Sequence, residues 1–289
     1  MRIFLFGAGY SAKAFARLMV GEAQDIAGTT RNEQNFPALE QAGISPLFFN
    51  EEASSPDLLD QLIKSTHVVI SISPGEKGDP SLALVEKALQ RPDNTIRWIG
   101  YLSTVGVYGD HNGEWVDETA HCKPTSRRSL ERLAAEQAWT LLCETHGTPL
   151  AILRLSGIYG PGRNAFINLE RGTARRIIKP DQVFNRIHVE DIARTLRLLA
   201  GTTTGGIFNI TDDEPAPPQD VVSFAANIMG VTPPPEIPFD DADMNPMARS
   251  FYGENKRVSN NRIQALGYEF IYPDYRTAFS AMWRNENWR

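Results

Sequence analysis

A glycine-rich stretch with the sequence GAGYSA occupies residues 7–12, directly after a short apolar run. Gly7 permits a tight turn, and Gly9 lets the backbone approach a bound group closely. Ala12 takes the third, small position, where a helix packs on a strand. The helix that follows would offer free N–H groups to an anion. The stretch predicts a pyrophosphate-binding loop with contacts from Gly7, Gly9, Tyr10 and Ser11. The alternative is a glycine turn that has lost its ligand.

The second predicted strand ends in the sequence AGTTRN, which contains no acidic residue. An acid here would bind the ribose 2′-hydroxyl of NAD, whereas Thr30 and Arg31 stand in its place. An arginine can pair with a 2′-phosphate through two parallel hydrogen bonds. The strand end therefore favours NADP over NAD, and a solvated surface arginine is the alternative. Ser73 and Leu102, near the ends of later strands, are further candidate cofactor contacts.

Two hydroxyls and two guanidinium groups come next in the chain. Ser103 and Thr104 end a predicted strand, and Arg128 and Arg132 lie one turn apart on a predicted helix. A guanidinium stays protonated, so it is a poor general acid or base. It can stabilise an oxyanion or bind an anionic substrate. The alternative is a solvated helix face on which both arginines pair with nearby glutamates, Glu131 and Glu136.

The composition limits the class of protein. The chain has 289 residues, a net charge of −6, 42% hydrophobic and 22% charged residues, which is an ordinary globular composition. We expect no nucleic-acid partner because no basic run is present, and no membrane association because no apolar run is long enough. Two cysteines at residues 122 and 143 suggest neither a metal site nor a disulfide framework. We expect a cytoplasmic protein with a small-molecule substrate, as a monomer or homodimer.

Strand and helix patterns alternate through most of the chain, which predicts a parallel sheet wound on both faces. We expect an α/β, Rossmann-like doubly wound sheet with a smaller C-terminal α/β substrate lobe. Residues 1–160 would form the nucleotide-binding domain, joined by a strand near 206–212. The lobe would comprise residues 161–205 and 213–289.

Several motifs in this order resemble a known family. They are GAGYSA, YLSTVGVYG, LAAEQ, LRLSGIYGPGR, RIHVEDIA and GIFNITDDEP, and together they cover residues 1 to about 215. They are similar to the extended short-chain dehydrogenase/reductases, the NAD(P)-dependent epimerase/dehydratase group that acts largely on nucleotide sugars. The ending from Glu254 onward resembles that of an atypical bacterial subgroup.

The resemblance implies a catalytic Ser or Thr, a Tyr, and a Lys four residues after the Tyr. Thr104 matches the hydroxyl position and Ser103 is adjacent to it. Arg132 stands at the lysine position, where it would also hold the cofactor ribose, and Arg128 stands at the tyrosine position. No tyrosine lies between Tyr108 and Tyr159, so the family's acid–base pair is replaced.

Other side chains are candidates for the missing roles. Tyr159 is a further candidate catalytic residue, and His188 either carries a proton or orders its loop through Glu190 or Asp191. Candidate substrate contacts are Tyr108, Glu118, Arg163 and Arg186. The polar stretch NKRVSN at residues 255–260 also favours a small-molecule pocket.

Three functions are compatible with these motifs. The first is an NAD(P)-dependent reductase, epimerase or dehydratase-like enzyme acting on a polar, possibly nucleotide-sugar, substrate. The second is a non-catalytic NADP-binding sensor or regulator, which the missing tyrosine favours. The third is a non-redox enzyme that keeps the cofactor as a structural group.

Overall fold

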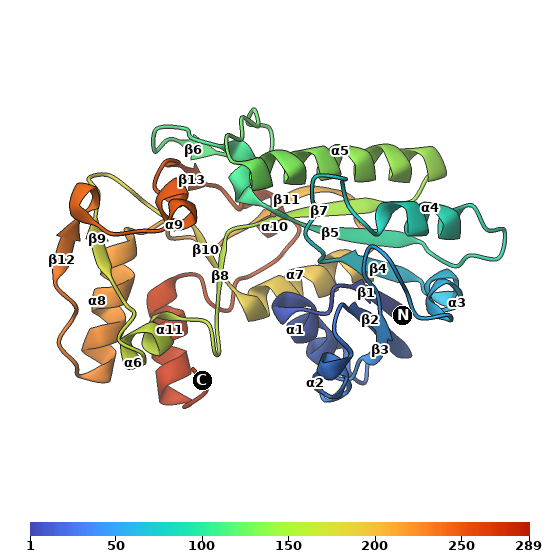
Figure 1. The fold of residues 1–289 in the computed structure, drawn as a ribbon, viewed down its shortest axis with the longest axis horizontal. Coiled ribbons are helices and arrows are strands. Elements are labelled where there is room, and N and C mark those ends of the chain that lie inside the picture. Colours follow the sequence, from blue (N-terminus) through green and yellow to red (C-terminus); the bar gives the residue numbers. More distant parts are fainter. The chain divides into compact units, whose positions relative to one another are not determined.

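The computed structural model describes residues 1–289, which form two compact units (Figure 1). Unit 1 comprises residues 1–107, 127–154 and 192–208. Unit 2 comprises residues 108–126, 155–191 and 209–289. Both units are therefore built from three separate segments of the chain.

A seven-stranded sheet with the order β11-β7-β5-β4-β1-β2-β3 forms the centre of the Rossmann-like fold. Its strands are β1 (Arg2–Phe6), β2 (Asp25–Thr30), β3 (Ser45–Phe48), β4 (His67–Ile70), β5 (Trp98–Thr104), β7 (Leu150–Leu155) and β11 (Gly206–Ile210). The pairs from β3 to β5 all run parallel, with Phe4 opposite Ala27 and Val68. This is the predicted fold class.

Helices cover both faces of the sheet, with α4 and α5 on one side and α1 and α7 on the other (Figure 1). They are α1 (Tyr10–Met19), α2 (Phe36–Glu40), α3 (Leu58–Lys64), α4 (Leu82–Leu89), α5 (Arg127–His146) and α7 (Val189–Gly201), with the 3₁₀ turns η1 (Glu33–Asn35) and η2 (Val105–Tyr108). Since both faces are covered, β4 reads as an unbroken apolar run after His67, and all its residues are buried.

A buried aspartate, Asp79, precedes the start of α4. The helix begins at Leu82 with Ser81 as its N-cap residue. The Asp79 carboxylate accepts hydrogen bonds from the Ser81 backbone N–H (2.9 Å) and hydroxyl (2.6 Å), and from Trp139 Nε1 (3.1 Å). Asp79 thus orders the turn before the helix and ties it to α5.

The two units do not divide where we expected. We placed residues 161–205 in the smaller lobe, whereas residues 192–208 cluster with unit 1. The reason is the apolar face of α7, on which Ile192, Leu196 and Leu199 are fully buried. The His67 ring on β4 also hydrogen-bonds the Ala200 carbonyl through Nε2 (3.1 Å).

The buried His67 ring makes the stability of the chain sensitive to acid. Burial lowers its pKa from 6.5 to about 4, so the folded state holds it neutral while the unfolded chain protonates below pH 6.5. Stability is therefore lost as pH falls from about 6.5 toward 4, by about 2 kcal/mol at pH 5. Urea unfolding at pH 7.5 and pH 5 should show this loss in the native protein and a smaller one in His67→Asn. Equal losses in both proteins would contradict the prediction.

Unit 2 is built from short elements. Its strands pair in parallel as β8 (Gly157–Tyr159) with β10 (Arg186–His188), β9 (Arg176–Ile178) with β12 (Glu236–Pro238), and β6 (Trp115–Val116) with β13 (Arg257–Val258). Its helices are α6 (Ala165–Glu170), α8 (Pro218–Met229), α9 (Pro246–Phe251), α10 (Asn261–Gln264) and α11 (Tyr275–Arg284), with the 3₁₀ turn η3 (Phe239–Asp241). A core of aromatic and aliphatic side chains between α6, α8 and α11 holds it together.

Two classes of feature are absent from the structure. None of the helices combines the length and hydrophobicity that crossing a membrane requires. No group of three or more His, Cys, Asp or Glu side chains is arranged to hold a metal ion.

Candidate functional site

The loop after β1 has the backbone geometry that a pyrophosphate site needs. Gly7 has φ +82°, and a Cβ there would lie 3.2 Å from Ile72, so only glycine suits the turn. A Cβ at Gly9 would meet nothing closer than the Gly7 carbonyl oxygen at 3.9 Å, so this side of Gly9 is open. Gly9 is the N-cap residue of α1, and no side chain caps the helix.

The sequence analysis missed Thr29, which fixes this loop. Its hydroxyl accepts a hydrogen bond from the Gly7 N–H, and its carbonyl accepts one from the Ala8 N–H, both at 2.8 Å. Thr29 is 1% exposed. A hydroxyl one residue before the strand end was the available signal, but nothing in the sequence says toward which loop it points.

The end of β2 presents Arg31 without a protein partner. Thr30 Oγ1 accepts weak hydrogen bonds from the Asn32 N–H (3.3 Å) and the Asn35 amide (3.4 Å), which hold the turn into η1. The Arg31 side chain is exposed, and no carboxylate pairs with it. It is thus available to an external anion. Ser73, after β4, is likewise exposed, whereas Leu102 is buried in β5.

Ser103 and Thr104 take different roles at the end of β5. The buried Ser103 hydroxyl donates a hydrogen bond to Glu136 on α5. Thr104 Oγ1 accepts a hydrogen bond from the Gly106 N–H at 3.1 Å, so its own O–H remains free to donate. The structure therefore leaves Thr104, and not Ser103, with a hydroxyl that a ligand could use.

Arg132 is anchored at the ends of two strands. Its Nη1 donates to the Leu102 carbonyl (2.8 Å), the Tyr101 hydroxyl (3.1 Å) and the Ile72 carbonyl (3.4 Å). Its guanidinium carbon also lies 5.5 Å from the centre of the Tyr101 ring. Nε and Nη2 remain as donors for a ligand.

The alternative of a solvated, glutamate-paired arginine face does not describe Arg132. Glu131 pairs with Arg127 (2.8 Å), which is largely exposed. Glu136 is buried and forms a bidentate ion pair with Arg154 of β7, at 2.7 and 3.2 Å. Arg128 is exposed on the first turn of α5.

Two predicted substrate contacts, Tyr108 and Glu118, converge on Asn209. The Tyr108 side chain is fully buried, and its hydroxyl donates to Asn209 Oδ1 at 2.7 Å. The Glu118 carboxylate accepts a hydrogen bond from the Asn209 N–H at 2.7 Å, and burial raises its pKa. These contacts give both side chains a structural use, in joining the loop at 108–118 to β11.

His188 is a buried, neutral ring. Its Nδ1 accepts a hydrogen bond from the Glu190 N–H at 3.2 Å, as expected for a residue that orders its loop. Burial lowers its pKa to about 4. It therefore remains uncharged near neutral pH and is poorly suited to carry a proton there.

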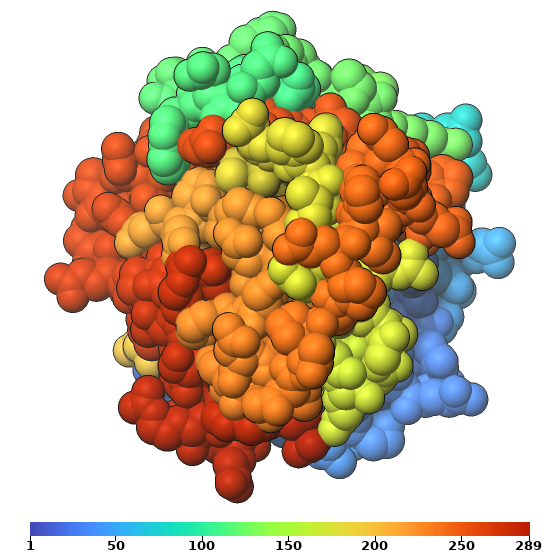
Figure 2. Space-filling model, turned by 90° about the vertical axis from the view of Figure 1, so that its left-hand side faces the viewer, coloured from blue at the N-terminus to red at the C-terminus, as the bar shows by residue number.

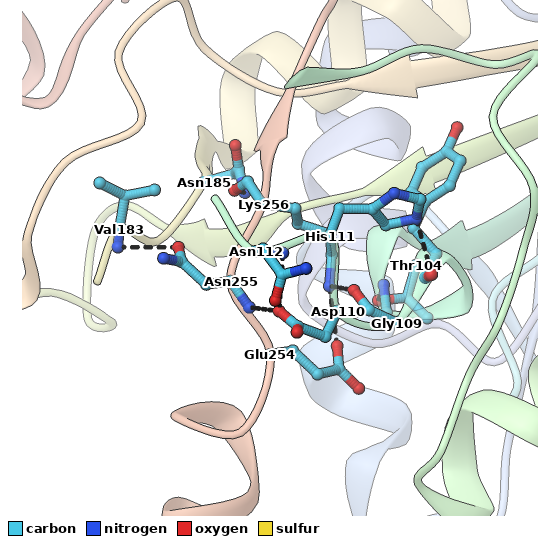
Figure 3. Close-up of polar contacts among 12 residues, drawn as sticks. Thr104, Gly109, Asp110, His111, Asn112, Val183, Asn185, Glu254, Asn255 and Lys256 are labelled. Carbon is cyan, nitrogen blue, oxygen red and sulfur yellow. Dashed lines mark hydrogen bonds and ion pairs between the residues drawn. The ribbon is translucent and has the colours of Figure 1, made fainter. Parts of the chain in front are cut away.

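The NKRVSN stretch belongs to a segment, residues 254–260, that we call the brace. Figure 3 shows the contacts of its first three residues, 254–256. The Asn255 backbone N–H donates to Asp110 (2.7 Å), and its side chain accepts a hydrogen bond from the Val183 N–H (3.2 Å). Lys256 is buried, and its ammonium group donates to the Gly109 carbonyl at 2.7 Å. These groups are used internally, in contrast to our expectation that the stretch lines a pocket.

The brace continues to the end of β11. The Asn260 amide donates to the Thr211 carbonyl (2.9 Å) and to Asp213 (2.7 Å). Asn185 bonds both the carbonyl of Lys256 (3.0 Å) and the N–H of Val258 (2.8 Å). One short segment thus joins three loops of unit 2 that are distant in the sequence.

A cavity of about 460 Å³ lies within unit 2, between β8, α6, α8 and α11. Figure 2 shows α8, in orange, on this face between the yellow-green α6 region and the red α11 region. Two predicted substrate residues, Arg163 and Arg186, line it together with Tyr159 and Arg171. Unit 2 therefore brings together three of the side chains singled out from the sequence.

Comparison with known proteins places this geometry in context. The model of the NAD dependent epimerase/dehydratase family matches residues 3–211. Protein YeeZ of Escherichia coli is 28% identical over 94% of this chain and 97% of its own. A functionally unknown conserved protein from Silicibacter pomeroyi is 45% identical with a TM-score of 0.89, covering 99% of each chain. A human epimerase family protein, solved with NADPH, has a TM-score of 0.76 at 16% identity, covering 99% of this chain and all of its own.

The match of the family model spans more than half of the chain and includes the glycine loop, the end of β5, and α5. The chain belongs to the NAD-dependent epimerase/dehydratase family.

Proposed function

We propose that this chain binds NADP and acts on a polar small molecule, possibly a nucleotide sugar, as a reductase, epimerase or dehydratase-like enzyme. The observation that carries the proposal is the open side of Gly9 at the uncapped start of α1. A pyrophosphate needs a close approach to the backbone, which the open side of Gly9 allows. It also needs N–H groups without a protein partner, which the first turn of α1 offers at Ser11 and Ala12. Gly7, Tyr10 and Ser11 would complete the contact.

The nicotinamide half of the cofactor would lie against Arg132. When bound, the cofactor supplies or accepts a hydride. The free Nε and Nη2 donors of Arg132 would bind ribose hydroxyls, while its Nη1 is held by Leu102 and Tyr101. Thr104 would donate its free O–H to the substrate oxygen and so polarise it.

Arg128 at the family's tyrosine position supports a second candidate, a non-catalytic NADP-binding sensor. A guanidinium cannot exchange a proton at working pH. If the chain is an enzyme, the proton that the family's tyrosine would exchange comes from water or from another tyrosine, and Tyr159 is the candidate. Burial raises the pKa of Tyr159 well above its usual value, so it would serve as an acid and not as a base.

Calorimetry with NADPH, followed by an absorbance assay with NADPH and a panel of sugar nucleotides and aldehydes, tests both candidates. Turnover that Thr104→Val abolishes, with NADPH binding unchanged, would support the enzyme. Binding without turnover of any panel member would favour the sensor. A chain that binds neither NADPH nor NADH would refute both.

Cofactor preference gives a separate prediction at Arg31. A charge-assisted bidentate pair with the 2′-phosphate should favour NADPH over NADH by roughly 1.5–3 kcal/mol. Arg31→Asp should reverse this order, because the carboxylate repels the phosphate and accepts a hydrogen bond from the free 2′-hydroxyl. Arg17→Asp, on an exposed turn of α1, makes the same charge change and should not alter the preference. Equal affinities of the native protein for NADPH and NADH would show that Arg31 does not select.

A further inference from the structure

The cavity in unit 2 is positively charged and has no acidic side chain in its lining. Arg163, Arg171 and Arg186 line it, and no Asp or Glu does. None of the three guanidinium groups forms an ion pair with a carboxylate of the protein. The chain as a whole carries a net charge of −6. Three arginines that form no ion pair therefore make this cavity positive within a protein that is negative overall.

Arg186 is the best fixed of the three. Its Nη1 donates to the Phe184 carbonyl (2.9 Å) and the Ala216 carbonyl (3.0 Å), so the guanidinium is held without being neutralised. Burial is the main cause that lowers its pKa, and the nearby Asp212 opposes this. Burial also raises the pKa of Asp212, which disfavours its charged form. A held, half-buried cation of this kind gains most from an anion that enters from outside.

Tyr159 supplies a second, independent sign of a ligand. The side chain is 6% exposed, its hydroxyl has no hydrogen-bond partner, and the residue lines the same cavity. Its ring is fixed by stacking on Phe279, with centroids 5.7 Å apart, and by an edge contact with His188. An unpaired buried hydroxyl is costly, and such groups persist where something other than the protein uses them.

Apart from the amide side chains of Asn164 and Asn168, the remaining walls of the cavity are apolar. Val221 and Val222 of α8, Ile158 of β8 and Ile167 of α6 contribute them. A ligand that fills the space would thus present a charged end to the arginines and an uncharged, partly apolar body to the helices.

We propose that this cavity binds a small organic oxyanion, a carboxylate or a phosphate ester, with its charge on the three arginines and an oxygen accepting from Tyr159. The assignment rests on the proposed function only in taking this anion to be the substrate. Arg186 and Tyr159 are then the residues that determine specificity for charge.

Binding of model anions tests the proposal without turnover. Calorimetry would compare phenyl phosphate and phenylacetate with the neutral phenylacetamide, in the absence of cofactor. We expect at least one anion to bind tenfold or more tightly than the amide, and the two anions distinguish a phosphate site from a carboxylate site. Arg163→Gln changes an exposed side chain that has no internal hydrogen bonds. It should lower the affinity for the anion at least fivefold and leave the thermal unfolding midpoint unchanged.

Tyr159→Phe and Tyr108→Phe form a matched pair. The first removes an unpaired hydroxyl, so it should raise the unfolding midpoint while weakening the anion. The second removes a hydroxyl that donates to Asn209, so it should lower the midpoint. Two outcomes would contradict the proposed anion site. Either the amide binds as tightly as both anions, or Tyr159→Phe leaves the affinity for the anion unchanged. NADPH binding measured on the same samples reports separately on the proposed function.

Discussion

Replacing Glu136 with alanine is expected to lower the free energy of unfolding by about 3–5 kcal/mol, because it removes the carboxylate that is paired with the buried charge of Arg154. Glu136 and Arg154 form a bidentate pair in which both side chains are 4% exposed. Glu136 also accepts a hydrogen bond from the hydroxyl of Ser103. One carboxylate thus connects α5 to both β5 and β7. Urea unfolding of the variant measures how much these contacts contribute to the free energy of unfolding.

The exposed pair on the same helix provides the control. Glu131→Ala breaks a contact with Arg127, whose side chain is 73% exposed, and exposed pairs contribute about 0–1 kcal/mol. The double variant Glu136→Leu with Arg154→Met removes both charges and should recover most of the loss. If Glu136→Ala were no more destabilising than Glu131→Ala, the buried pair would have no special part in holding α5.

Gly9→Val is expected to weaken dinucleotide binding at least a hundredfold, ~2.7 kcal/mol. The Cβ side of Gly9 is open in the protein, so a branched side chain would fill the space that a pyrophosphate needs. The backbone at Gly9, with φ −83° and ψ −157°, is extended and accepts an L-residue. The fold should therefore survive, with an unchanged thermal midpoint.

A graded series makes this prediction sharper. Gly9→Ala adds one methyl group to the same space and should cost less affinity than Gly9→Val. Calorimetry with NADPH measures both. Native affinity in the valine variant would remove the cofactor from this loop, and with it the main support for the proposed function.

Local sequence patterns predicted most of unit 1. The seven strands and the glycine turn follow from apolar runs and from residues with narrow backbone preferences, which depend on few neighbours. Spacing alone assigned the catalytic hydroxyl to Thr104, whose O–H is free to donate, and its role stays a prediction. Partners from other segments could not be predicted. Glu136 pairs with Arg154, which lies on a strand that begins after α5 ends. Thr29 of β2 accepts a hydrogen bond from Gly7, which follows the neighbouring strand β1.

Unit 2 was less predictable for the same reason. Its strands are two or three residues long, too short to show a period, and its polar side chains bond to distant backbone groups. Tyr108 and the NKRVSN stretch looked suited to a ligand because they are polar and lie on loops. Only the arrangement of the chain shows that their hydrogen-bonding groups bind Asn209, Asp110 and Gly109 instead.

The brace has a consequence for the order of folding. Asp110 accepts a hydrogen bond from the N–H of Asn255, which lies 145 positions later in the chain. The loop after β5 therefore cannot form this contact until nearly the whole of unit 2 has been synthesised. Contacts of such long sequence separation slow folding, because the intervening chain loses entropy before it gains them. As the chain emerges during synthesis, residues 108–118 would remain exposed until residues 254–260 arrive. Chaperone dependence would then concentrate in this interval.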